Sequence, residues 1–219
     1  LQTKVNKTFK MLKKSKRPVI ILGGGVEISK SKSKLNKLFS KFKLPYVTTW
    51  SGLDCCHFSQ DNYIGTIGVY GSRAANFAIQ NSDFVLNIGS RLDTRITGGK
   101  PNSFARNAKI ISVDIDINEL NKKRGLNNFL KINNSIKDFL EFFNLKPKFK
   151  AHKNWIKICN DWKNKYPNVL EEWRKQKKFV NPYYFIEILS EELKKNDIII
   201  ADDGAHLTWS VQAFKIKKK

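Results

Sequence analysis

The stretch Pro18-Val-Ile-Ile-Leu22-Gly23-Gly24-Gly25 decides the fold of this chain. It is a short, continuously apolar run with β-branched residues, which is typical of a strand buried on both faces of a sheet, and the glycine triplet ends it. Upstream, Val5, Phe9 and Leu12 recur at the spacing of an amphipathic helix. Because strands that alternate with helices build a parallel sheet, we expect an α/β fold.

The alternation of strands and helices continues to about residue 145. The segment 51–70 carries turn residues with little periodicity, and we predict a long loop there. The expected fold is therefore a Rossmann-like parallel sheet with helices on both faces. Further strands are predicted at Pro45–Thr49, Asp83–Ile88, Lys109–Val113 and Phe129–Ile132, with helices in 35–42, 73–81 and 136–143.

The composition changes after residue 145. Residues 146–180 are rich in Lys and carry Trp155, Cys159 and Trp162 at helical spacing. This pattern predicts a helical connector that follows the α/β domain.

A new unit begins at Asn181-Pro182, an N-cap residue followed by Pro, which predicts the start of a helix. A strand is predicted after that helix, at Ile198–Ala201. One helix, one strand and a turn do not make a domain, so this unit is expected to be an incomplete second α/β unit. The predicted parts are therefore the α/β domain 1–145, the connector 146–180 and the incomplete unit 181–219.

The chain is strongly basic, with 41 Lys and Arg against 19 Asp and Glu among 219 residues and a net charge of +22. Such a charge suggests a nucleic-acid binder. However, only 7 of the basic residues are Arg, which reads phosphates and base edges better than Lys does. The Lys residues are spread along the chain as solvated helix faces, so we expect no specific nucleic-acid partner.

Compartment and membrane contact also follow from the composition. No apolar run reaches the roughly 18–20 residues that span a bilayer, and no signal peptide is apparent. Cys55 and Cys56 are adjacent and Cys159 lies far away, which fits neither a disulfide framework nor a zinc site. We expect reduced thiols in a cytoplasmic protein that contacts no membrane.

Glycine-rich and charged motifs follow three of the predicted strands. In an open α/β sheet, ligands bind outside the carboxyl ends of the strands. Glycines let a backbone approach a pyrophosphate, arginines bind phosphates, and a carboxylate accepts from a ribose hydroxyl. The motifs therefore predict a nucleotide-type ligand at one edge of the sheet. The candidates are Gly23, Gly24 and Gly25, then Arg91, Asp93 and Arg95, and then Asp114 and Asp116.

Each of these motifs also has a purely structural interpretation. The glycine triplet can form a tight turn between strand and helix. Asp93 can pair with a neighbouring Arg, and Asp116 can cap a helix. The histidines are His57, His152 and His206, and they form no Ser-His-Asp or Cys-His pattern, so no catalytic residue is predicted and His57 is interpreted as a loop residue.

Several motifs occur in a specific order. They are Gly68-Val-Tyr-Gly-Ser-Arg-Ala-Ala-Asn76, Ser82-Asp-Phe-Val-Leu-Asn-Ile-Gly89, Ser90-Arg-Leu-Asp-Thr-Arg-Ile-Thr-Gly98 and Ala108-Lys-Ile-Ile-Ser-Val-Asp-Ile-Asp116. This order resembles the central domain of acetolactate (acetohydroxyacid) synthases, which are thiamine-diphosphate enzymes. The resemblance includes 16–25 and 45–52, and 199–212 is similar to the start of the family's C-terminal domain.

The resemblance implies a six-stranded parallel sheet that is the middle of a three-domain enzyme. Such an enzyme decarboxylates one 2-oxo acid and joins it to a second, as in branched-chain amino-acid biosynthesis, with thiamine diphosphate and Mg²⁺ and as a homodimer or homotetramer. The family's activating Glu and its Mg²⁺-binding Gly-Asp-Gly…Asn segment have no counterpart here, so the chain alone is expected to be inactive. The alternatives are another thiamine-diphosphate decarboxylase or carboligase, or a stand-alone nucleotide-binding module.

The resemblance also implies the roles of individual residues. In acetolactate synthases the central domain binds FAD, which has no redox role in the reaction. The chain departs from the family's motifs at Tyr70, Leu92-Asp93-Thr94, Asn133-Asn134 and Ala205, so ADP or no ligand stays an alternative to FAD. The implied FAD contacts are Gly23, Gly24, Gly25, Thr49, Gly68, Arg91, Asp93, Arg95, Asp114 and Asp116, and the implied contacts to the phosphates of thiamine diphosphate are Gly204, Ala205 and His206.

Overall fold

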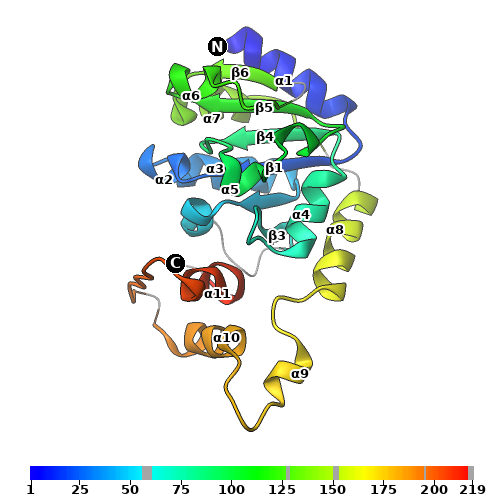
Figure 1. The fold of residues 1–219 in the computed structure, drawn as a ribbon. Coiled ribbons are helices and arrows are strands. Elements are labelled where there is room, and N and C mark those ends of the chain that lie inside the picture. Colours follow the sequence, from blue (N-terminus) through cyan, green and yellow to red (C-terminus); the bar gives the residue numbers. More distant parts are fainter. Residues whose placement is uncertain (56–60, 127–128, 150–152, 195, 217–219) are drawn as a thin grey trace.

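A six-stranded, all-parallel sheet forms the centre of the molecule (Figure 1). The computed structural model describes residues 1–55, 61–126, 129–149, 153–194 and 196–216. The strands are β1 (Pro18–Leu22), β2 (Tyr46–Thr48), β3 (Tyr63–Thr66), β4 (Phe84–Ile88), β5 (Lys109–Asp114) and β6 (Phe129–Asn133). Their order, β3-β2-β1-β4-β5-β6, places β1 beside β4 and makes the chain wind outward from this pair in both directions. The predicted Rossmann-like parallel sheet is confirmed.

Five of the six strands lie within a residue or so of the predicted ones. The exception is β3, which lies inside the segment 51–70 where we predicted a loop, and that prediction was wrong. Gly65 interrupts this four-residue strand with a φ of +134°, and its pairing with β2 shifts register between Tyr46 and Val47. A strand that is short and irregular shows no clear period in the sequence.

Long helices cover both faces of the sheet. On one face lie α1 (Gln2–Lys14), α3 (Lys32–Phe42) and α7 (Ile136–Asn144), and on the other lie α4 (Arg73–Gln80) and α8 (Lys153–Lys165). Side chains alternate between the two faces along β1, so both faces need cover. Ile20 and Leu22 belong to the first core, which lies between the sheet and α1, α3 and α7, whereas Val19 and Ile21 belong to the second core, which lies between the sheet and α4 and α8. The apolar residues that predicted the first helix, Val5, Phe9 and Leu12, are buried in the first core.

Short helical turns follow the strands at their carboxyl ends. They are α2 (Gly25–Ile28), η1 (Trp50–Cys55), α5 (Thr94–Thr97), η2 (Pro101–Ser103) and α6 (Ile117–Asn121). Within the described ranges, no helix has both the length and the apolar composition that a bilayer-spanning segment requires.

The predicted connector helix is present as α8 and packs on the sheet. Trp155 and Cys159 are buried in the second core, and the indole N–H of Trp155 donates to the carbonyl of Pro18 at 3.1 Å. Cys55 and Cys159 are free thiols, and burial raises the pKa of Cys159 to about 12. His57, His152 and Cys56 lie outside the described residues, and the predicted boundaries at 145 and 180 stay predictions.

The remaining helices lie beyond the β3 edge of the sheet (Figure 1). They are α9 (Glu171–Arg174), α10 (Pro182–Glu192) and α11 (Ala205–Ala213), which share a small core around Val169, Ile186 and Ala213. The strand predicted at Ile198–Ala201 is absent from this described segment, so that prediction was wrong. The side chains of Ile198 and Ile200 are 85% and 91% exposed, and among the described residues no strand pairs with this segment to supply the backbone partners that a strand requires.

Candidate functional site

The strand order makes the carboxyl ends of β1 and β4 the switch point of the sheet, where the chain changes direction. The two strands pair in register from Pro18 with Phe84 to Leu22 with Ile88. The chain leaves β1 toward β2 and leaves β4 toward β5, so the loops after the two strands diverge. Such a switch point is where open α/β sheets bind ligands. The sequence motifs at Gly23 and Arg91 follow these two strands.

The glycine triplet packs directly against the loop after β4. The N–H of Gly23 donates to Ile88 O at 2.9 Å, and that of Gly25 donates to Gly89 O at 3.1 Å. A Cβ at Gly23 would overlap the carbonyl of Gly89, and one at Gly25 would lie 2.9 Å from the Cα of Gly89. The tight-turn interpretation therefore accounts for these glycines without a ligand. Gly24 is the N-cap residue of α2, and a Cβ there would meet Ser51.

The loop after β4 carries the two candidate arginines, both exposed. Asp93 caps α5, because its carboxylate accepts from the backbone N–H of Arg95 at 3.0 Å. Among the described residues, neither Arg91 nor Arg95 forms an ion pair with Asp93. The local Arg–Asp pair that the sequence allowed is therefore not formed. The guanidinium of Arg95 instead lies 5.9 Å from the ring centre of Trp50, a cation–π contact.

Asp114, the last residue of β5, and Asp116, two residues beyond it, are held by local backbone groups. Asp116 caps α6 by accepting from Asn118 N at 2.8 Å, as the structural interpretation predicted. Asp114 accepts from the N–H of Asp116 at 2.9 Å. Each carboxylate keeps further acceptor capacity, because an ionised carboxylate has about four lone-pair sites.

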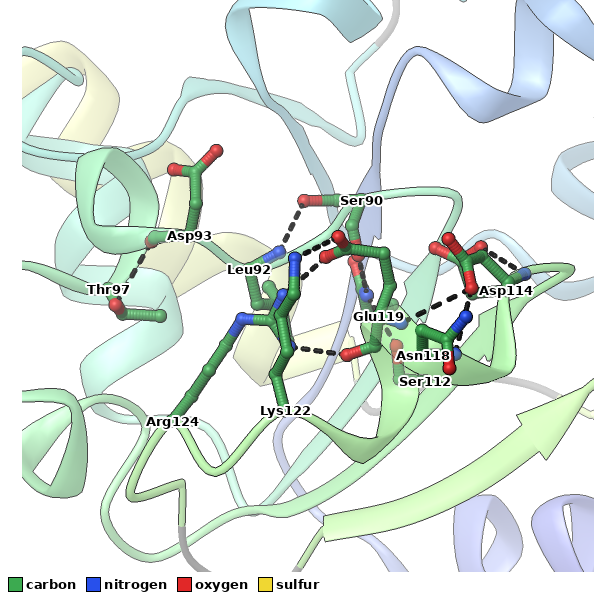
Figure 2. Close-up of polar contacts among 12 residues, drawn as sticks. Ser90, Leu92, Asp93, Thr97, Ser112, Asp114, Asn118, Glu119, Lys122 and Arg124 are labelled. Carbon is green, nitrogen blue, oxygen red and sulfur yellow. Dashed lines mark hydrogen bonds and ion pairs between the residues drawn. The ribbon is translucent and has the colours of Figure 1, made fainter.

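Figure 2 shows an ion-paired cluster next to Asp114. Glu119 in α6 pairs with Lys122 and with Arg124, which lead toward β6. The hydrogen bond from Lys122 and the charges of both partners hold the pKa of Glu119 below its ordinary value. These ion pairs join α6 to the segment that leads to β6.

Thr49 and Gly68 connect the outer strands to the same edge. Thr49 is buried, and its N–H donates to Leu22 O at 2.9 Å. Gly68 has a φ of +118°, and a Cβ there would lie 2.5 Å from Arg95 O. This close approach allows Val69 N to donate to Arg95 O at 2.8 Å. The loop after β3 is thus fastened to α5.

Three residues that sequence reasoning did not select belong to this edge. Trp50 and Tyr70 form a tilted ring pair with 5.8 Å between centroids, next to Arg95. Asn87 lies fully buried in β4 and donates hydrogen bonds to Ser90 O and Ser112 Oγ. A polar residue inside an otherwise apolar strand was the available signal for Asn87.

Gly204, Ala205 and His206 lie elsewhere, at the exposed start of α11. Gly204 has a φ of +153°. α11 reaches the α/β domain at β3, where Thr66 Oγ1 donates to Val211 O at 3.3 Å, and at Tyr70, whose carbonyl accepts from Gln212 Nε2 at 2.6 Å.

A cavity of about 570 Å³ is lined by Trp50 of η1 and by Leu207 of α11, but not by Gly204, Ala205 or His206. In the described part of the chain, no recorded hydrogen bond joins residues 204–206 to the switch point. The structure therefore brings together the candidates after β1 to β5 but not those of α11.

Comparison with known proteins adds independent findings. Residues 5–142 match the model of the family "Thiamine pyrophosphate enzyme, central domain". The acetolactate synthase large subunit of Pyropia yezoensis is 31% identical over 215 residues, covering 96% of this chain and 35% of that protein. The large subunit of Lactococcus lactis is 32% identical, covering 93% and 34%. The probable large subunit of Methanocaldococcus jannaschii is 31% identical, covering 97% and 36%. The chain spans about a third of the length of these relatives.

Proposed function

The chain belongs to the thiamine pyrophosphate enzyme central-domain family, and from this premise we propose that it is part of a thiamine-diphosphate-dependent carboligase of the acetolactate synthase type. The reaction is the decarboxylation of one 2-oxo acid and its joining to a second, as in branched-chain amino-acid biosynthesis. The observation that carries the proposal is the extent of the similarity, which covers 93% to 97% of the chain in three relatives named as acetolactate synthase large subunits. It therefore includes α10 and α11 as well as the α/β domain.

We propose that the α/β domain contributes a nucleotide-binding site to this enzyme, which holds FAD or ADP at the switch point. Two arginines on one loop supply positive charge for a diphosphate, and Asp114 and Asp116 have acceptor capacity for hydroxyl groups. The residues fit such a ligand with one restriction. The space beside Gly23 and Gly25 is filled by the backbone of Gly89, so the arginines rather than a glycine cradle would bind the phosphates.

The start of α11 is proposed to hold the phosphates of thiamine diphosphate through Gly204, Ala205 and His206. The N-terminal N–H groups of a helix favour an anion, and α11 has nine residues and begins exposed. When bound, thiamine diphosphate supplies the carbanion chemistry of the reaction. In the described ranges no group of three His, Cys, Asp or Glu side chains forms a metal site, so the proposed Mg²⁺ would need ligands from other parts of the enzyme. The proposed assembly is a homodimer or homotetramer.

The test is carboligation by the complete protein that contains this chain. We expect acetolactate from pyruvate only when thiamine diphosphate and Mg²⁺ are present, and no product from residues 1–219 alone. Release of aldehyde and CO₂ without carbon–carbon bond formation would instead indicate a decarboxylase. Product formed equally without thiamine diphosphate would contradict the proposal.

A further inference from the structure

Asn87 is a polar residue in a fully buried strand of the sheet. All five residues of β4 are buried, and the other four are Phe, Val, Leu and Ile. The exposed fraction of Asn87 is 0%. Since side chains alternate along a strand, Asn87 shares a face with Val85, which belongs to the core beneath α4 and α8. It lies two residues before Gly89 and thus at the end of the strand that leads into the switch point.

The carboxamide of Asn87 holds the loop that follows its own strand. Its Nδ2 donates to Ser90 O at 2.6 Å and to Ser112 Oγ, on β5, at 2.7 Å. Ser90 Oγ in turn accepts from the backbone N–H of Leu92 at 3.3 Å, as Figure 2 shows. Asn87 therefore connects the first turn of this loop to two strands of the sheet.

This turn needs such support because its backbone is unusual. Gly89 has a φ of +68° and Leu92 a φ of +52°. A left-handed conformation is unfavourable for Leu and persists only where the surroundings hold it. The side chain of Leu92 is buried, and the hydrogen bonds through Ser90 fix the backbone on its other side. Arg91 lies between these two residues, and Arg95 follows in α5.

The stability of the sheet does not explain a carboxamide at this position. Asn87 Oδ1 is buried without a hydrogen-bond partner among the described residues. Leaving a buried acceptor unpaired is unfavourable, and an apolar side chain at position 87 would not carry this cost. The donor side of the carboxamide must therefore be the part that the fold uses.

We propose that Asn87 is a positioning residue of the nucleotide site, acting through the Ser90 carbonyl on the loop that carries Arg91 and Arg95. The inference rests on the proposed nucleotide site and names the residue that fixes its two cations in place. A supporting residue of this kind acts on affinity because small displacements of charged groups weaken a preorganised site.

The test uses Asn87→Ala and a matched control in the complete protein. Asn144 is also buried, donates from Nδ2 to a backbone carbonyl (Lys34 O, 2.9 Å) and has an unpartnered Oδ1. It lies in α7 on the opposite face of the sheet. Affinity for ADP and for FAD is measured by calorimetric titration for wild type, Asn87→Ala and Asn144→Ala, and for Asn87→Ala in an Arg91→Ala background.

We expect Asn87→Ala to weaken nucleotide binding on the order of tenfold, and Asn144→Ala to leave affinity unchanged although both lower stability. In the Arg91→Ala background, the further loss from Asn87→Ala should be clearly smaller than in the wild type, because the two residues act together. Equal losses of affinity in Asn87→Ala and Asn144→Ala, or full additivity with Arg91→Ala, would overturn the proposal.

A second readout separates this inference from the nucleotide site itself. Amide hydrogen exchange of residues 89–97 without ligand should accelerate in Asn87→Ala and not in Asn144→Ala. If wild type binds neither ADP nor FAD, the proposed nucleotide site is wrong. Faster exchange of residues 89–97 in Asn87→Ala would then still show that Asn87 positions the loop. Unchanged exchange in Asn87→Ala would overturn the positioning as well.

Discussion

Asp83 connects the start of β4 to the turn before β1. Its carboxylate accepts from Ser15 Oγ, from Lys16 N at 2.8 Å and from Arg17 N at 2.9 Å. Burial acts to raise the pKa of Asp83, but the hydrogen bonds from Ser15 and the two backbone N–H groups outweigh it and hold the pKa below its usual value. The charged form is therefore the one that the fold stabilises.

We expect Asp83→Asn to lower the free energy of unfolding by about 1–3 kcal/mol at pH 7, because hydrogen bonds to a charged acceptor are the stronger ones. Since the pKa of Asp83 is lowered in the folded state, its contribution is present above the unfolded pKa of about 3.9 and is lost as the pH falls below it. Urea unfolding between pH 7 and pH 3 measures both effects. Asp161→Asn, which removes an exposed pair with Lys157, is the control and should change stability by less than about 0.5 kcal/mol. A pH-independent difference between wild type and Asp83→Asn would contradict this explanation.

A substitution at Gly23 tests the contact between the loop after β1 and the loop after β4. A Cβ there would overlap the backbone of Gly89, which cannot rotate away as a flexible side chain would. We expect Gly23→Ala to cost about 1–3 kcal/mol, the range of overpacked sites. Gly99→Ala is the matched control, since no atom lies within 4 Å of a Cβ at Gly99. Thermal unfolding of the two variants decides: equal melting temperatures would show that the loops do not touch as described.

At the scale of elements, α8 links the Lys-rich segment to the sheet. Trp155 is 3% exposed, its indole N–H donates to Pro18 O, and its ring meets that of Trp162 at 5.7 Å in an edge-on arrangement. The hydrogen bond joins α8 to the first residue of β1. The helix therefore completes the cover of the second face.

Trp155→Phe keeps an aromatic ring but removes this donor, and we expect a loss of about 1–2 kcal/mol in the free energy of unfolding. Trp162→Phe is the control, because the indole N–H of Trp162 has no recorded hydrogen bond within the described ranges and its loss should be smaller. Chemical denaturation measures both variants. A greater loss in Trp162→Phe would show that the hydrogen bond to Pro18 does not anchor α8.

The sequence predicts a helix or strand well when the apolar residues of that segment alone show the period of the element. Strands β1, β4 and β5, with their apolar runs, were predicted within a residue for this reason, and the helices with apolar residues on one side were predicted within about three residues. β3 was missed because Gly65 and the register shift against β2 remove its period. The strand at Ile198–Ala201 was predicted from an apolar run, but a strand also depends on neighbours, which a local pattern does not report.

In the candidate site, too, the sequence predicted some features and not others. The carboxyl ends of parallel strands lie at one edge of a sheet, so the placement of the motifs after β1, β4 and β5 at that edge was predictable, whereas the strand order was not. The detailed roles were not: Asp93 caps α5 instead of pairing with an arginine, and Gly23 and Gly25 accommodate Gly89. These contacts join residues more than sixty positions apart or depend on single hydrogen bonds, which spacing alone does not determine.

At the scale of the whole molecule, ion pairs to the buried carboxylate of Glu187 join the C-terminal helices. Glu187 in α10 is 5% exposed and pairs with Arg174 and, at 2.9 Å, with Lys215. Burial alone would raise the pKa of Glu187, but the hydrogen bonds from Arg174 and Lys215 lower it overall. The cluster joins α9, α10 and the segment after α11. Breaking such a buried pair leaves an uncompensated charge, so these elements are expected to hold together as one unit.

The same unit exposes much apolar surface. Exposed side chains in this region include Phe179, Val180, Phe185, Ile198 and Ile200. Apolar surface of this extent is typical of an interface with further protein. Together with relatives about three times as long as the chain, it supports the proposal that α10 and α11 function as part of a larger enzyme.

In the proposed nucleotide site, Arg91 and Arg95 at the switch point bind the phosphates of the ligand. Titration of ADP into the complete protein tests it most directly, with the double variant Arg91→Ala/Arg95→Ala compared with Lys100→Ala, which removes an exposed cation nearby. Losing charge-assisted hydrogen bonds should weaken ADP binding at least about tenfold in the double variant, and Lys100→Ala should leave it within about twofold. Wild-type protein that binds neither ADP nor FAD, or equal affinities in all three proteins, would contradict the account.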